Sequence, residues 1–414
     1  MLKELFPRVH RRYSSLPVLG AVMDGFAEYL VAQGYPRIPR CRHVRAAQHI
    51  DKLLKKRGCL TLAAITHANL LACAPPPGHS QDNPDVAAAV RLLTRYLDER
   101  GFLPPSAPPS LTEMKLADYE TYLRQVRGLA PSTIKHHVTT ASRFISHLDN
   151  HNGLSRLPGL TPLHIEEFVK HTGGRLSRES LQHSVAQLRS FLRFLGTRGD
   201  APAGLGAQID TARVYRGERL PHALPWETVR ALLASINRTT PMGLRDYAMF
   251  VLITTYGLRA CEVVGLKLEE IEWRMGRIHV RQRKTASPLL LPLTGSVGDS
   301  LLSYIRRGRP AIPCREIFVR HRAPAGILKP TAVTEAFQAM TKRSGLNISF
   351  QGPHCLRHSY AVHLLRLGTP LKTIGDMLGH RNAESTCVYL RLAVEDLRGV
   401  ALELPLSAAQ EVRS

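Results

Sequence analysis

The fold of the last third of the chain is decided by the stretch HCLRHSYA at residues 354–361. Apolar residues recur around it at helical spacing, which predicts helices from Pro353 to Leu390. Arg357 stands inside this pattern, and a guanidinium stays charged and donates hydrogen bonds in a planar fork that matches two phosphate oxygens. The stretch therefore predicts a helix that presents cationic side chains to a phosphate.

Two further patterns in this third predict helices combined with a little sheet. The segment from Asp246 to Tyr256 reads DYAMFVLITTY, an apolar helix that ends at Gly257, a residue type that often terminates helices in a left-handed conformation. Residues 277–283 alternate with period two, and the apolar run 289–293 returns after a short turn. We therefore expect a β-hairpin with Lys284 at its bend.

The candidate site residues suit an attack on a phosphodiester bond. Such a reaction needs a nucleophile, positive charge around the crowded phosphorus and a proton for the leaving oxygen, and many nucleases obtain these from carboxylates that hold metal ions. No D-x-D pattern or carboxylate triad occurs near these motifs, so positive side chains can replace the metal. The candidates are, in chain order, Arg259, Lys284, His354, Arg357, His380 and Tyr389.

One pattern has an alternative interpretation as a metal site. His354 and His358 are four residues apart, a spacing that places two imidazoles on one face of a helix, as in some zinc sites. The residues between them are Cys-Leu-Arg rather than a pattern containing glutamate, so we expect no metal and no cofactor, and we expect His358 to be a packed or hydrogen-bonded neighbour.

Four motifs in this order resemble the tyrosine recombinase (phage integrase) family. Residues 255–266, TYGLRACEVVGL, are similar to its first arginine motif, and residues 354–361 to its H-x-L-R-H motif. Residues 374–380, IGDMLGH, and residues 385–389, STCVY, resemble its L-G-H and T-x-x-Y motifs. The resemblance is firm from Leu224 to Leu390 and looser over residues 119–199, which are similar to the helical core-binding domain.

The resemblance implies a role for each candidate residue. Arg259, Arg357 and His380 would contact the scissile phosphate, and His354 would assist proton transfer and positioning. Lys284 would act as general acid on the leaving 5′ oxygen, although the segment around it reads RKTASP where the family more often has a glycine-flanked turn. Tyr389 would become linked to a 3′ phosphate. Glu262, at an acidic position of the family, would support the residues that contact the phosphate without contacting it itself.

Composition agrees with a nucleic-acid partner. The chain has 56 Lys and Arg against 33 Asp and Glu, a formal net charge of +23, which is typical of proteins that bind phosphate backbones. Its seven cysteines are scattered without a C-x-x-C pair, which argues against a disulfide framework and favours a reducing compartment. No leader-like or membrane-spanning apolar run is present in the sequence, so we expect a cytoplasmic bacterial protein.

The pattern along the chain predicts four segments. Prolines at 104, 105, 108 and 109 and a Gly-, Ala- and Pro-rich stretch from about 200 divide it into a helical domain at 1–105, a second helical domain at 106–205, a basic linker at 206–223 and a catalytic domain at 224–414. Residues 26–54 and 92–101 resemble 119–148 and 191–199 at separations of 93–98 residues. We interpret the first domain as a possible duplicate of the second, with chance similarity between amphipathic helices as the alternative.

Together these observations predict a fold that is mainly α with a small antiparallel sheet, an α+β catalytic domain preceded by helical DNA-binding domains. The expected function is a site-specific recombinase acting on double-stranded DNA through Tyr389, and the extra amino-terminal domain favours an integrase or transposase of a mobile element. Residues 392–400 have helical spacing, and the family packs such a tail on a neighbouring subunit, which implies a homotetramer or a mixed tetramer with related recombinases. The alternatives are a tail folded on its own domain, a relaxing enzyme of the type IB topoisomerase class, and a DNA-binding regulator without catalysis.

Overall fold

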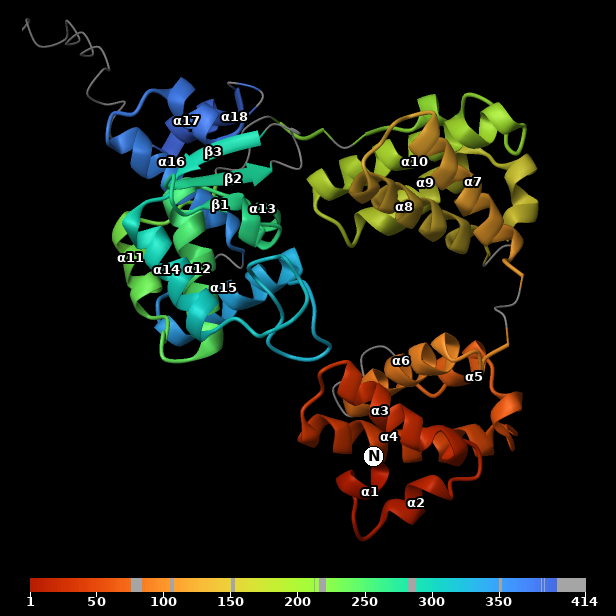
Figure 1. Ribbon diagram of the computed structural model, residues 1–414. Helices are drawn as coiled ribbons and strands as arrows, with labels where there is room; N and C mark the ends of the chain where they lie inside the picture. Colours follow the sequence, from red (N-terminus) through yellow and green to blue (C-terminus); the bar gives the residue numbers. More distant parts are fainter. Residues whose placement is uncertain are drawn as a thin grey trace, which may run out of the picture. The chain divides into compact units, whose positions relative to one another are not determined.

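The structure is a computed structural model that describes residues 1–75, 84–104, 108–149, 153–211, 213–215, 221–281, 288–349, 352–380, 382 and 384–392. The chain divides into two compact units: the first joins Met1–Leu103 with Arg219–Ser414, and the second is Pro104–Glu218 (Figure 1). The described residues are mainly helical and contain one three-stranded antiparallel sheet, which confirms the predicted fold class.

Residues 1–103 form helices around a hydrophobic core of their own. The helices are α1 (Leu2–Leu5), α2 (His10–Ser14), α3 (Met23–Ala32), α4 (Arg37–Lys56), α5 (His67–Leu71) and α6 (Pro84–Glu99). Phe26, Ile50 and Leu93 are completely buried where α3, α4 and α6 pack together. The Asp51 carboxylate is buried as well, and its Oδ1 accepts hydrogen bonds from the backbone N–H groups of Val18 and Leu19 at 3.1 and 2.7 Å.

The second unit is also built from helices. It contains α7 (Leu111–Gln125), α8 (Pro131–Asp149), α9 (Pro162–Gly173) and α10 (Arg178–Arg198). α7 begins with a capping box, in which the Ser110 hydroxyl accepts from the Glu113 N–H at 3.2 Å while the Glu113 carboxylate accepts from the Ser110 N–H at 2.7 Å. Tyr119, Phe191 and Phe194 are completely buried and fix the contact between α7 and α10.

The carboxy-terminal segment packs helices around the apolar helix predicted at residues 246–256. This helix, α12 (Pro241–Tyr256), begins earlier than predicted, because Thr240 caps it and Pro241 occupies its first turn. It ends at Gly257 with φ of 65°, as predicted. The others are α11 (Trp226–Ala234), α13 (Ala260–Val264), α14 (Gly295–Arg307), α15 (Pro330–Ser344), α16 (His354–Arg366), α17 (Leu371–Leu378) and α18 (Glu384–Cys387), followed by a 3₁₀ turn at Val388–Leu392.

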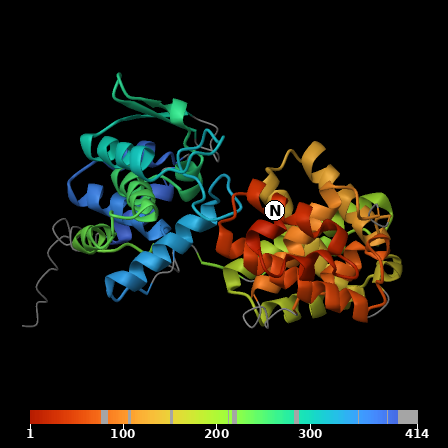
Figure 2. The same cartoon turned by 60° about the horizontal axis from the view of Figure 1, so that its bottom comes forward.

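The small sheet is built on the predicted hairpin. Strands β1 (Ile271–Glu272), β2 (Arg277–Arg281) and β3 (Pro288–Pro292) lie in the order β1-β2-β3 (Figures 1 and 2). Ile278 lies opposite both Ile271 and Leu291. Ile278, Val280 and Leu291 are buried against the helices, which is why the strand alternates with period two. Lys284, which was predicted at the bend, and the tail helix expected beyond Leu392 lie outside the described residues.

No helix among the described residues has both the length and the apolar character needed to cross a bilayer.

Candidate active site

Arg259 is held at the start of α13 by Glu262. One carboxylate oxygen of Glu262 accepts from the Arg259 backbone N–H at 2.8 Å, and the other accepts from its guanidinium at 2.7 Å. The Glu262 side chain is 1% exposed and that of Arg259 17%, so the carboxylate is hidden while part of the guanidinium still reaches solvent. Glu262 therefore fixes the backbone and the side chain of Arg259 together, as a supporting residue would.

Arg357 lies on the first turn of α16 and is almost completely buried. Its guanidinium donates to the backbone carbonyl of Gly257 and, at 2.6 Å, to that of Leu378, which connects the end of α12 to the end of α17. Burial, together with the nearby charge of Arg259, lowers the pKa of Arg357 to about 10. The group is still charged at neutral pH, so two neighbouring guanidinium groups form a site for an anion.

The site needs glycine at position 257. A Cβ atom there would lie 2.5 Å from Cδ2 of Leu378 and 2.8 Å from Cδ1 of Tyr360, and the φ of 65° is unfavourable for any other residue. Only glycine lets the chain turn so closely against α16 and α17, and this turn places the carbonyl that Arg357 binds and the backbone that leads to Arg259.

His380 follows a second left-handed glycine. α17 ends at Gly379 with φ of 61°, and the next residue turns its Nδ1 to within 2.9 Å of the Thr386 hydroxyl. Burial, with the charges of Arg357 and Arg259, lowers the pKa of His380 to about 4, so the imidazole is neutral at neutral pH. Because the ring is neutral, His380 can donate a hydrogen bond to a phosphate without adding a third positive charge beside Arg259 and Arg357.

Tyr389 is enclosed in the same site. The residue is 2% exposed, and its ring stacks on His380 with centroids 6.3 Å apart. Burial raises the pKa of Tyr389, while the charges of Arg357 and Arg259 act in the opposite direction. The same chain therefore supplies both the Tyr389 phenol and the two arginines whose charges favour the ionised form of that phenol.

One contact of the phenol was missed by sequence reasoning. His358 Nδ1 lies 3.1 Å from Tyr389 Oη, and the His358 ring meets the His354 ring edge-on at 4.5 Å between centroids. Burial, with His354 and Arg357 nearby, lowers the pKa of His358 to about 3, so this imidazole is neutral. The sequence analysis expected His358 to be a packed or hydrogen-bonded neighbour, but nothing in the sequence indicated that its partner is Tyr389.

The described candidates lie in one site, although they come from separate parts of the chain. The charges of Arg259 and Arg357 act on the pKa values of His380 and Tyr389, and Tyr389 contacts residues from α16 and the end of α17. Lys284 lies outside the described residues. Within the described ranges, no group of three or more His, Cys, Asp and Glu side chains is arranged to hold a metal ion.

Comparison with known proteins identifies the class. The model of the phage integrase family matches residues 223–396, and that of the phage integrase N-terminal SAM-like domain matches residues 116–199. A putative integrase/recombinase, y4rA, from Sinorhizobium fredii (strain NBRC 101917 / NGR234) is 32% identical over 389 residues, which cover 92% of this chain and 93% of the relative. The chain belongs to the phage integrase family of tyrosine recombinases.

Two solved structures share the fold. The XerH site-specific recombinase in its post-cleavage complex with palindromic difH substrate matches with a TM-score of 0.54 and 17% identity, over 69% of this chain and 83% of its own. A lambda integrase tetramer bound to a Holliday junction matches with a TM-score of 0.50 and 17% identity, over 71% and 88%. At these identities the similarity concerns the fold alone.

Proposed function

We propose that this protein is a site-specific DNA recombinase that breaks and rejoins strands through a covalent bond between Tyr389 and a 3′ phosphate, without a metal ion. The observation that carries the proposal is the enclosure of the Tyr389 hydroxyl beside His358, in a site that also holds Arg259, Arg357 and His380. A protein that only occupies DNA sites would have no use for a phenol buried beside the charges of Arg259 and Arg357.

The chemistry follows from the charges. The Tyr389 hydroxyl gives up its proton with the assistance of His354, and Oη attacks phosphorus. The bond from phosphorus to the 5′ oxygen breaks, Lys284 protonates this leaving oxygen, and the two guanidinium groups with His380 stabilise the negative charge that builds on the non-bridging oxygens. Glu262 holds Arg259 in place. The ester stores the energy of the broken bond, so a 5′ hydroxyl of another strand can reseal it without ATP.

The rest of the chain would hold and pair the DNA. We propose helical domains at 1–105 and 106–205, a basic linker at 206–223 and a catalytic domain at 224–414, working on double-stranded DNA in the bacterial cytoplasm. Pairing of two sites requires several protomers, so we propose a homotetramer or a mixed tetramer with related recombinases. The lambda integrase tetramer on a Holliday junction supports such an assembly.

Trapping of the covalent intermediate tests this function. Purified protein is incubated with genomic DNA in excess chelator and denatured, and the DNA ends that remain attached to protein are sequenced. We expect adducts on 3′ ends, clustered at sites that consist of two short inverted repeats. Adducts spread over unrelated sequences, with plasmid relaxation and no recombinant product, would instead indicate a topoisomerase, and the absence of adducts would indicate a regulator.

A further inference from the structure

The helix α4 carries a stripe of exposed basic residues. Positions 42, 45, 49, 52 and 56 follow the spacing 3, 4, 3, 4, which keeps them on one face of a helix over about 21 Å. The only acidic residue of α4, Asp51, is buried and engaged by two backbone N–H groups, so it does not neutralise this face. The stripe consists of Arg42, Arg45, His49, Lys52 and Lys56, all exposed.

The pattern of buried and exposed positions on α4 recurs on a helix of the second unit. Residues 45–54 on α4 and 139–148 on α8 are exposed, half-buried and buried in the same order at every position. Ile50 corresponds to Phe144 and Leu54 to Leu148, and all four are buried in their own cores. The amino-terminal helix therefore packs by the pattern of α8, which supports the predicted duplication.

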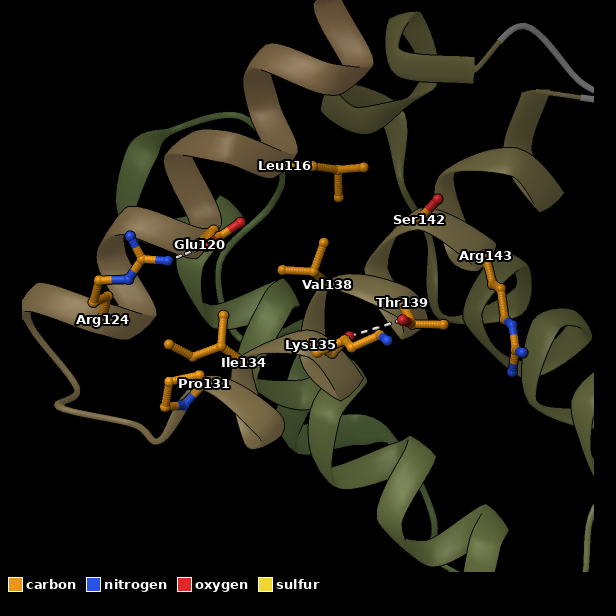
Figure 3. Close-up of a pocket in the computed structure, with 10 residues that line it drawn as sticks. All are labelled: Leu116, Glu120, Arg124, Pro131, Ile134, Lys135, Val138, Thr139, Ser142 and Arg143. Carbon is orange, nitrogen blue, oxygen red and sulfur yellow. Dashed lines mark hydrogen bonds and ion pairs between the residues drawn. The ribbon is translucent and has the colours of Figure 1, made fainter. Parts of the chain in front are cut away.

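The exposed faces of the two helices differ in charge. On α8 this face lines an open pocket with α7, in which Thr139, Ser142 and Arg143 lie to one side of the apolar side chains of Leu116 and Val138, and Lys135 of α8 lines the pocket as well (Figure 3). At the positions that correspond to Thr139 and Ser146 of α8, α4 has Arg45 and Lys52. α4 therefore packs by the same pattern as α8 but carries cations where α8 carries these hydroxyl groups.

The details of the stripe favour a phosphate backbone as its partner. Between Arg42 and Lys56 no exposed apolar residue interrupts the stripe, although the centre of a protein interface is normally apolar. The Arg45 guanidinium lies over the ring of Phe6 at 5.8 Å from its centroid, which supports the side chain and leaves its edge free to donate. A linear array of cations without apolar anchors suits the sequence-independent contacts that position a protein on a duplex.

We infer that the basic stripe of α4 binds the phosphate backbone of duplex DNA and adds contacts to those of the catalytic segment. The inference rests on the proposed function only in that DNA is the substrate. It gives the amino-terminal domain a role in affinity and not in strand cleavage.

A salt titration with matched variants tests the stripe. One variant carries Arg42→Gln, Lys52→Gln and Lys56→Gln, and the control carries Lys3→Gln, Arg91→Gln and Arg100→Gln, which are exposed residues of the same domain outside the stripe. The measurement is the slope of log affinity against log salt for the full-length protein on a long mixed-sequence duplex. The slope is negative, and each lost phosphate contact makes it shallower by about 0.9, so we expect it to become less steep by about 3 in the stripe variant and to change little in the control.

The outcomes separate this inference from the proposed function. The inference about the stripe would be overturned if the two variants had equal slopes of log affinity against log salt, or if neither slope differed from that of the unmodified protein. It would also be overturned if the stripe variant lost affinity for double-stranded RNA and kept its affinity for DNA. The stripe variant should still form covalent adducts at low salt, when the DNA is saturating. If the unmodified protein formed no adducts, the proposed function would fail, while the result of the salt titration would still stand.

A second inference concerns His358 and depends on Tyr389 being the nucleophile. The 3.1 Å contact between His358 Nδ1 and Tyr389 Oη is the only hydrogen bond found for this hydroxyl among the described residues. Burial is the main reason that the imidazole is neutral, and His354 and Arg357 of its own helix, His222 and His380 act in the same direction, while Tyr389 faces it through the hydrogen bond. A neutral ring can leave Nδ1 as an acceptor for the phenolic O–H.

We propose that His358 is a positioning residue, which aims the Tyr389 hydroxyl at the phosphate by accepting its hydrogen bond. Loss of the acceptor leaves the phenol free to turn, and misplacement by about 1 Å can cost on the order of 100-fold in rate. We therefore expect His358→Ala to lower the rate of adduct formation about 10- to 100-fold at saturating DNA, with unchanged DNA affinity.

A conservative variant distinguishes positioning from general packing. His358→Asn places an amide oxygen near the position of Nδ1 and should restore most of the rate, whereas His358→Leu fills the space without an acceptor and should not. Thermal unfolding measures whether both variants are folded. If they are folded and the asparagine and leucine variants form adducts at equal rates, the positioning role is refuted.

Discussion

Replacement of Tyr389 by phenylalanine is expected to abolish covalent protein–DNA adducts and to leave DNA affinity nearly unchanged. The substitution removes one oxygen atom and keeps the buried ring that stacks on His380. Without that oxygen no bond to phosphorus can form, whereas the cations that bind the phosphate are all retained. Adducts are measured on a nicked substrate that traps the intermediate, and affinity is measured on the intact duplex.

The control for Tyr389→Phe is Tyr360→Phe. Tyr360 is also a buried tyrosine of the carboxy-terminal segment, and it packs near Gly257 without a role in the proposed chemistry. Loss of a single buried hydrogen bond costs about 1 kcal/mol, so both variants should remain folded. Adducts that persist in Tyr389→Phe and map to another residue would show that the nucleophile was assigned wrongly.

The sequence was sufficient to predict most of the carboxy-terminal segment because its elements are marked by local signals. The apolar helix, its left-handed stop at Gly257 and the period-two hairpin each depend on residues close together in the chain. The start of α12 was predicted several residues late, because the Thr240 cap and Pro241 lie ahead of the apolar run on which the prediction was based.

Contacts between distant residues could not be predicted in this way. The two carbonyls that hold Arg357 belong to residues 257 and 378, and both are backbone atoms, which no side-chain pattern records. The contact of His358 with Tyr389 joins positions 31 residues apart on separate helical elements. For the amino-terminal domain, similarity of amphipathic patterns left chance as an alternative, and only the residue-by-residue burial on α4 and α8 gave stronger support for duplication.

Arg357→Lys is expected to lower the rate of adduct formation by about 100- to 1000-fold, the range found when one preorganised donor to a developing oxyanion is removed. The arginine binds the Gly257 and Leu378 carbonyls with two different nitrogens and is a candidate to contact the phosphate as well. A lysine has one nitrogen and cannot reproduce this fork. The measurement is the single-turnover rate of adduct formation on a nicked duplex.

The same substitution should also destabilise the fold, because it leaves a buried carbonyl without its donor at a cost of about 1–3 kcal/mol. Thermal unfolding measures this part separately, and the rate is compared below the unfolding transition. Arg366→Lys is the matched control, since Arg366 is exposed in the last turn of the same helix and should lose neither stability nor rate. A lysine at 357 that supported the full rate would mean that one point charge is sufficient there, and the two-arginine phosphate site would have to be abandoned.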